Sequence, residues 1–246
     1  MLKRTDTATK PVKGVPFTRF VGDLNRKKII LVASSGIAPR LQEFREPETG
    51  YYVYPKEIQI DDLYLPKKHF GIEDIEHDLN VLFPIDSLRA LAEEGLILAP
   101  TDEHVSMYGY HFVIGHIRNV VAPYIAEVVE GADAGGAIIL SGCMFCHRMA
   151  AVLQRAIEDR GIPSVIVSQY PKMSLYYEVS RIFYPVGFKT GHAVGPPNFP
   201  ELHKKVLKDA LELLVSATEP LTLVEKEYPE YPDPRPKRKY LRKSRE

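Results

Sequence analysis

A strand–helix–strand pattern between residues 136 and 168 constrains the fold of this chain more than any other feature. The apolar run GAIILSG is short enough for a buried strand and ends in small residues, Ser141 and Gly142. The segment CHRMAAVLQRAIEDRG follows, with apolar residues at helical spacing and a terminal Gly161. A second apolar run, IPSVIVSQ, comes next. Two buried strands joined by a helix predict a parallel βαβ unit.

The same alternation of strands and helices extends over most of the chain. KKIILVASSGI predicts a buried strand that ends in a small-residue loop, and RIFYP predicts a short strand. The helices are predicted in FPIDSLRALAEEGLI, in GHIRNVVAPYIAEVVEGADA, where Pro123 marks a kink or the true start, and in FPELHKKVLKDALELLVSAT. YYVYPKEIQI predicts an edge strand or hairpin, because Pro55 excludes a central position. We therefore predict an α/β fold, a layered parallel (Rossmann-like) sheet with helices on both faces.

The 246 residues allow one sizeable domain. We predict an N-terminal arm over residues 1–26, a single α/β domain over 27–220, and a tail over 221–246 that is Pro-rich and then basic. A tail of this composition is predicted to be disordered, and the alternative is an arm that docks a partner or nucleic acid.

Charge and hydropathy limit the partners. The formal net charge is zero, so bulk charge does not favour binding to nucleic acid. No apolar run approaches the roughly 18–20 residues of a membrane span, and the N-terminal segment lacks the apolar core of a secretory signal. We expect a cytoplasmic protein. A bound nucleotide is not expected, since the chain contains neither G-x-G-x-x-G nor a P-loop.

Cys143 and Cys146 are the only cysteines of the chain. One C-x-x-C pair cannot form a disulfide framework, and in a reducing compartment such a pair is more often catalytic, redox-active or metal-binding than inert. Cys143 follows a predicted strand and Cys146 opens a predicted helix, which is where ligand sites of parallel sheets form. The helix N-terminus stabilises a thiolate, so we expect Cys143 to ionise readily. Cys146 would resolve an adduct on Cys143 as a disulfide, and His147 would tune the two thiols.

Other segments supply candidate substrate-binding residues. They offer backbone N–H groups, hydroxyls, imidazoles or room for a substrate: Ser35, Gly36, His69, Ser141, Gly142, Gly191 and His192. Two alternatives stay open for the cysteines. They are an inert buried pair, and a zinc site made by Cys143, Cys146, His147 and a distant ligand such as His192. The chain has no second C-x-x-C or H-x-x-x-H, which argues against structural zinc.

The cysteine segment resembles the region around the redox-active selenocysteine of the selenoprotein B family. This family comprises the B subunits of glycine, sarcosine and betaine reductases and the related D-proline reductase subunit. The residues that carry the resemblance read IILSGCMFCHRM and IEDRGIPSVIV. KKIILVASSGI, HFGIEDIEHDLNVLFPIDSLRALAEEG and FYPVGFKTGHAVGPP are similar to further segments of the family, in the same order. Together they cover most of residues 27–215, and Cys143 falls at the selenocysteine position.

The resemblance implies a selenium-free, thiol-dependent reductase that acts on a small, amino-acid-like substrate. It implies that Cys143 attacks the carbon beside the substrate nitrogen, so that reductive C–N cleavage follows, and that Cys146 discharges the adduct. It also implies a separate pyruvoyl-type subunit that activates the amine. No cofactor is predicted, but an external dithiol or thioredoxin-like donor must reset the pair. A non-catalytic redox-sensing or partner-binding subunit and a zinc protein are the alternatives, and a homo-oligomer stays open.

Overall fold

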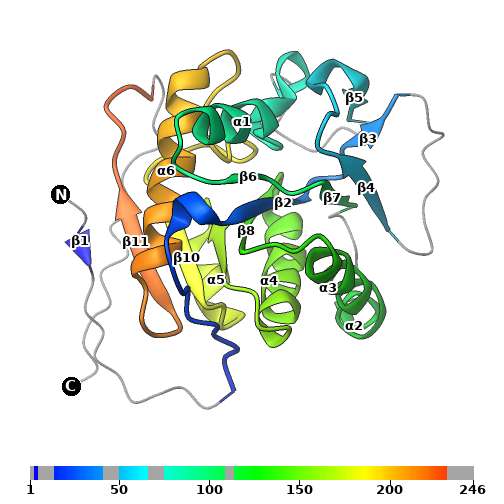
Figure 1. The fold of residues 1–246 in the computed structure, drawn as a ribbon, viewed down its shortest axis with the longest axis vertical. Helices are drawn as coiled ribbons and strands as arrows, with labels where there is room; N and C mark the ends of the chain where they lie inside the picture. The colour runs from blue at the N-terminus through cyan, green and yellow to red at the C-terminus, as the bar shows by residue number, and fades with distance from the viewer. Residues whose placement is uncertain (1–2, 5–13, 41–49, 66–74, 109–113, 232–246) are drawn as a thin grey trace.

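The computed structural model describes residues 3–4, 14–40, 50–65, 75–108 and 114–231 (Figure 1). A nine-stranded sheet runs through the centre of the molecule. Its strands are, in spatial order, β1 (Lys3–Arg4), β11 (Thr222–Lys226), β10 (Arg181–Pro185), β9 (Ser164–Val167), β8 (Gly136–Ser141), β2 (Lys28–Ser34), β7 (Glu103–Met107) and β4 (Tyr51–Pro55), with β6 (Ala99–Pro100) paired to β2.

The strands from β11 to β7 pair in parallel, and within the described part of this sheet only the two outermost pairings, β1 with β11 and β4 with β7, are antiparallel. The predicted parallel α/β sheet is therefore confirmed. Every residue of β8 is buried, as expected for a parallel strand that is covered on both faces.

Helices cover both faces of this sheet (Figure 1). One face carries α1 (Ile85–Glu93) and α6 (Pro200–Ser216), and the other carries α2 (Ile114–His116), the π-helix η5 (Ile117–Val121), α3 (Ala122–Gly131), α4 (Met144–Asp159) and α5 (Pro171–Tyr176). Strand side chains alternate between two apolar cores, Leu31 and Ile138 facing α1 and α6 while Val32 and Ile139 face α3 and α4. No helix in the described ranges has the length and apolar character to cross a membrane.

Smaller elements fill the connections. These are the 3-10 turns η1 (Leu24–Arg26), η2 (Ile60–Asp62), η3 (Ile75–His77) and η4 (Leu79–Val81) and a two-stranded sheet of β3 (Ala38–Pro39) and β5 (Leu63–Tyr64). Two local predictions are confirmed. Pro123 lies in the first turn of α3, directly after the π-helix, and β4 is an edge strand that ends at Pro55.

Strand β7 was not predicted, and it places His104 in the core. The Nδ1 atom of His104 accepts a hydrogen bond from the backbone N–H of Leu31 at 3.0 Å. Burial, assisted by the charge of Arg89, lowers the pKa of His104 to about 3. This imidazole is therefore neutral in the folded protein at neutral pH.

The C-terminal boundary differs from the expected tail at residue 221. Thr222–Lys226 form strand β11 in the main sheet, and Tyr228 and Tyr231 are buried. Tyr228 donates a hydrogen bond to Asp209 of α6 at 2.6 Å. Residues 232–246, which include the basic cluster, lie outside the described residues.

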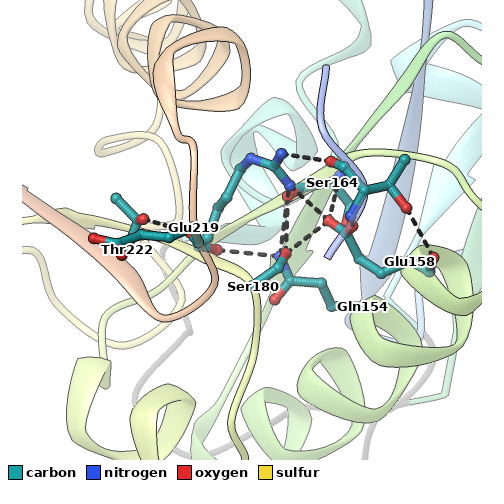
Figure 2. A network of polar contacts seen from close by, with 8 residues as sticks. Gln154, Glu158, Ser164, Ser180, Glu219 and Thr222 are labelled. Carbon is teal, nitrogen blue, oxygen red and sulfur yellow. Dashed lines mark hydrogen bonds and ion pairs between the residues drawn. The ribbon is translucent and has the colours of Figure 1, made fainter. Parts of the chain in front are cut away.

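A buried ion pair holds the N-terminal segment against the sheet (Figure 2). The Arg181 guanidinium lies 2.8 Å from the Glu158 carboxylate, and both side chains are fully buried. Ser164 and Ser180 also donate to that carboxylate. The Thr18 carbonyl accepts from Arg181 at 2.6 Å. Residues 158, 164 and 181 lie where α4 ends and where β9 and β10 begin, so this network is at the opposite end of the sheet from the cysteines.

Candidate functional site

Cys143 lies at the junction between β8 and α4 and caps the helix. Its backbone is extended, at φ −147° and ψ 177°, and its Sγ accepts a hydrogen bond from the Cys146 N–H at 3.3 Å. A cap of this kind satisfies one of the free N–H groups in the first turn of the helix. The sulfur is therefore held at the positive end of the α4 dipole, as the sequence predicts.

The two sulfur atoms are in contact but differ in burial. Cys143 Sγ lies 2.7 Å from Cys146 Sγ. Cys143 is 8% exposed, whereas Cys146 is fully buried. Burial raises the pKa of Cys146 well above its usual value, and the adjacent Cys143 raises it further. Cys146 therefore stays a thiol, and either sulfur can donate the hydrogen bond between the two.

His147 is fully buried and is bound through both ring nitrogens. The N–H of Gln169 donates to Nε2 at 3.1 Å, so Nε2 is an acceptor and the proton of the neutral ring is on Nδ1. Nδ1 then donates to the carbonyl of Cys143 at 2.8 Å. Protonating this ring would break the bond to Gln169. The geometry therefore makes His147 a support for the Cys143 backbone rather than a proton donor to the thiols.

Gln169 links the cysteine segment to the glycine-rich loop. It directly follows β9 and Ser168, and its side-chain amide donates to the carbonyls of His192 and Ala193 at 3.4 and 3.3 Å. Tyr170 adds a second link, because its ring packs edge-on against His147 at 4.8 Å and its hydroxyl bonds Thr190. The structure therefore brings the loop of Gly191 and His192 together with the Cys143 segment.

Tyr231 fixes His192 from the other side. Its hydroxyl accepts from the Lys189 N–H at 3.0 Å and lies 2.8 Å from His192 Nδ1. A hydroxyl can accept two hydrogen bonds and donate one, so the tautomer of the His192 imidazole decides which of the two groups donates. The Tyr231 ring also stacks on Phe188 at 4.1 Å. Sequence reasoning did not find Gln169 or Tyr231. Gln169 lies at the carboxyl end of a strand adjacent to β8, and that position is the signal that would identify it.

The loop after β2 differs from the predicted arrangement. The N–H groups of Ser35 and Gly36 both donate to the carbonyl of Met107, at 3.1 and 2.8 Å. They are therefore not available for a substrate carboxylate. The Gly142 N–H is likewise bound to the Ser34 carbonyl at 3.1 Å.

Hydroxyl groups remain as the polar atoms of this region. The hydroxyls of Ser34, Ser35 and Ser141 are buried and make no hydrogen bond within the described part of the chain. Ser34 and Ser141 are register partners on β2 and β8, so their side chains lie on the same face of the sheet. Gly142 lies next to Ser35, since a Cβ atom added to Gly142 would be 3.4 Å from the Ser35 Cβ. Buried hydroxyls that lack partners are groups that a bound ligand can satisfy.

Two further expectations concern His69 and a zinc site. His69 lies outside the described residues. Within the ranges that are described, no three or more His, Cys, Asp or Glu side chains are grouped so as to hold a metal ion. The zinc alternative therefore gains no support from the structure.

The chain matches no protein-family model, and no solved structure is significantly similar to it. Its curated relatives include D-proline reductase subunit gamma of Acetoanaerobium sticklandii, which is 27% identical over 209 residues, covering 84% of this chain and 85% of the relative. Glycine reductase complex component B subunit gamma of Peptoclostridium acidaminophilum is 28% identical over 221 residues, which is 85% of this chain but 50% of the relative. The sarcosine reductase complex component B subunit beta of the same organism is 27% identical over 191 residues, 74% of this chain and 43% of the relative.

The chain thus spans most of the D-proline reductase subunit and about half the length of the glycine reductase relatives. Across most of its own length, this chain is a homologue of the glycine, sarcosine and betaine reductase B subunits and of the D-proline reductase gamma subunit, at 25–28% identity.

Proposed function

We propose that this chain is a selenium-free, thiol-dependent reductase subunit in which Cys143 is the nucleophile and Cys146 the resolving thiol. The observation that carries the proposal is the asymmetry of the pair. The sulfur atoms lie 2.7 Å apart at the N-terminus of α4, and Cys143 keeps 8% of its surface exposed while Cys146 is fully buried. A partly exposed thiol in contact with a fully buried thiol is an arrangement that suits thiol–disulfide chemistry.

The proposed reaction has two sulfur steps. The Cys143 thiolate attacks the carbon beside an activated amine, a C–S bond forms, and the amine leaves with the electron pair of the C–N bond. Cys146 then gives up its proton and attacks the Cys143 sulfur, which forms a disulfide. The electron pair of the C–S bond passes to the carbon, which takes a proton. The substrate carbon gains two electrons, and the two thiols lose them.

Other components complete the cycle. An external dithiol of thioredoxin type would reduce the Cys143–Cys146 disulfide, and a separate pyruvoyl-type subunit would activate the substrate amine. Several relatives are by name components of reductase complexes, which supports a partner subunit. The scheme needs a compartment that keeps thiols reduced, so we propose the cytoplasm.

The substrate would lie between the cysteine segment, the loop after β2 and the glycine-rich loop that carries His192. The buried hydroxyls of Ser35 and Ser141 supply hydrogen-bonding partners, Gly142 leaves space for approach, and His192 offers an imidazole from the loop that Gln169 and Tyr231 fix in position. His69 is retained as a proposed proton donor. Sulfur is a weaker nucleophile than selenium, so we expect slower turnover than a selenocysteine enzyme would give.

Alkylation kinetics test the proposed roles. The rate at which iodoacetamide modifies Cys143 should rise with a midpoint below the free-thiol value of about 8.5. Mild oxidation should give a Cys143–Cys146 disulfide by mass spectrometry. Cys146→Ser should keep the alkylation but lose the disulfide, and Cys143→Ser should abolish turnover. Two thiols that stay unreactive in the folded protein would refute the scheme.

A further inference from the structure

A surface groove lies between the first turns of α4 and α5. We call it the α4–α5 groove, and it is lined by Met144, Phe145, Arg148, Lys172, Met173 and Tyr176, with Tyr177 at its wall. Met144 and Phe145 directly follow Cys143 in the chain. The side chain of Arg148 donates to the Tyr177 hydroxyl at 3.0 Å, which ties the first turns of α4 to the end of α5. A molecule seated in this groove therefore contacts the two residues that directly follow Cys143.

The apolar side chains of the groove are unusually exposed. Tyr176 is 80% exposed and Met144 is 45% exposed. Single exposed apolar residues are ordinary, but two that line one groove form a patch of the kind that marks an interaction site. Methionine is flexible and polarisable, and it is favoured on surfaces that adapt to a protein partner. An open, apolar surface of this kind suits a macromolecule better than a small substrate, which is held in an enclosed pocket.

The charge of the groove selects the kind of partner. Arg148 and Lys172 are among the lining residues, whereas none of those residues is a carboxylate. A cationic groove attracts a partner that presents carboxylates. A second copy of this chain fits poorly, because a two-fold contact would place the same two cations of both copies against each other.

We infer that the α4–α5 groove docks the protein that reduces the Cys143–Cys146 disulfide, and that this partner presents an apolar side chain flanked by carboxylates beside its thiols. The redox step of this inference rests on the proposed function, whereas the docking of an acidic partner follows from the residues that line the groove. Cys143 is the more exposed sulfur, so the partner's thiolate attacks it and Cys146 leaves as a thiolate, which takes up a proton. The partner's second thiol then releases Cys143 and forms the partner's own disulfide. Two electrons pass from the partner to this chain.

Two synthetic peptides test the charge preference. Each carries one cysteine as a 2-thiopyridyl disulfide between leucines, flanked by glutamates in one peptide and by lysines in the other. Release of 2-thiopyridone from the reduced protein measures attack by Cys143. At low salt the acidic peptide should react about fivefold faster than the basic one, as expected from one exposed ion pair. Salt should reduce this ratio.

Matched variants locate the preference. Lys172→Glu should bring the rate ratio of the two peptides to one or below, whereas Lys208→Glu, which makes the same charge change on α6 at the other face, should leave it unchanged. Tyr176→Ser should slow both peptides, whereas Tyr124→Ser, at a tyrosine on α3 that is 53% exposed, should not. Iodoacetamide should modify Cys143 at the same rate in all four variants. A ratio that Lys172→Glu does not change would overturn the inference.

A binding measurement keeps the groove testable if the thiols are unreactive. In the Cys143→Ser protein, fluorescence anisotropy follows a labelled acidic peptide whose cysteine is replaced by serine. Binding that Lys172→Glu weakens and Lys208→Glu does not would support the docking site even if Cys143 does no chemistry. Equal binding of the acidic and basic peptides would overturn it. A dimer of the wild-type protein that Tyr176→Ser dissociates, observed by sedimentation, would also overturn it, because the occupant would then be a second copy.

Discussion

Replacement of Arg181 by methionine should destabilise the protein severely, although the volume of the side chain changes little. Arg181 donates to Glu158 at 2.8 Å and to the Thr18 carbonyl at 2.6 Å, and its side chain and that of Glu158 are fully buried. The variant leaves the Glu158 carboxylate without this cation inside the protein. Removing one partner of a buried pair costs about 3–5 kcal/mol of unfolding free energy.

The cost should depend on pH in a defined direction. Burial raises the pKa of Glu158, and the charge of Arg181 opposes that rise. Without Arg181 the folded-state pKa rises further above the unfolded value of about 4.3. A carboxyl whose folded pKa is raised stabilises the protein most when it is protonated. The deficit of Arg181→Met relative to wild type should therefore shrink as the pH falls from 7 to 5.

Urea unfolding followed by circular dichroism measures these changes. Arg160→Met is the matched control. Arg160 lies at the end of α4, the helix that carries Glu158, and pairs with Glu127 and Glu130 at the surface. Loss of this exposed pair should cost less than about 1 kcal/mol of unfolding free energy. The double variant Glu158→Leu/Arg181→Met should be more stable than Arg181→Met alone, since it leaves no buried charge. A cost of Arg181→Met no larger than that of Arg160→Met would refute the reasoning.

Three further predictions concern single side chains. His104 must stay neutral in the fold, so between pH 7 and pH 5 the wild type should lose about 2 kcal/mol more unfolding free energy than His104→Asn; parallel pH profiles in urea unfolding would contradict this. Tyr231→Phe keeps the ring stacked on Phe188 but removes the hydrogen bond between its hydroxyl and His192 Nδ1, so the pH profile of turnover should change while the melting temperature moves by a few degrees. A pH profile of Tyr231→Phe that equals the wild-type profile would exclude a positioning role for Tyr231. Gly142→Ala adds a Cβ in ordinary contact with Ser35, so stability should hold while attack of Cys143 on a substrate slows; equal rates would mean that substrate does not approach over Gly142.

The sheet could be predicted where its strands are uniformly apolar. β2, β8 and β9 follow from their apolar runs, and α4 follows from its periodicity and from Gly161. β7 could not be predicted in this way, because its sequence EHVSM includes polar residues that are buried in the fold, such as His104, which accepts a hydrogen bond from the Leu31 N–H. β11 has only one buried residue, Val224, so its pattern resembles a polar tail.

Part of the candidate site could likewise be predicted from local sequence, and part could not. The position of Cys143 and Cys146 follows from local spacing, because a strand that leads into a helix fixes where both residues lie. The role of His147 does not, since it depends on a hydrogen bond from Gln169, which is 22 residues further along the chain. Tyr231 is 39 residues from His192. Contacts of this kind leave no signal in the local sequence, because they exist only after the sheet has formed.

The attachment of the N-terminal segment has a consequence for synthesis on the ribosome. The Thr18 carbonyl is bound by Arg181, which is 163 residues later in the chain. At about 5–20 residues per second, roughly 10–30 s pass between the synthesis of the two residues. During that interval the Phe17 ring, which lies 4.2 Å from the Arg181 guanidinium in the folded protein, has no partner there. The Thr18 segment is thus one of the last to dock although it is made 163 residues before its partner, and a nascent-chain chaperone would have this interval to bind it.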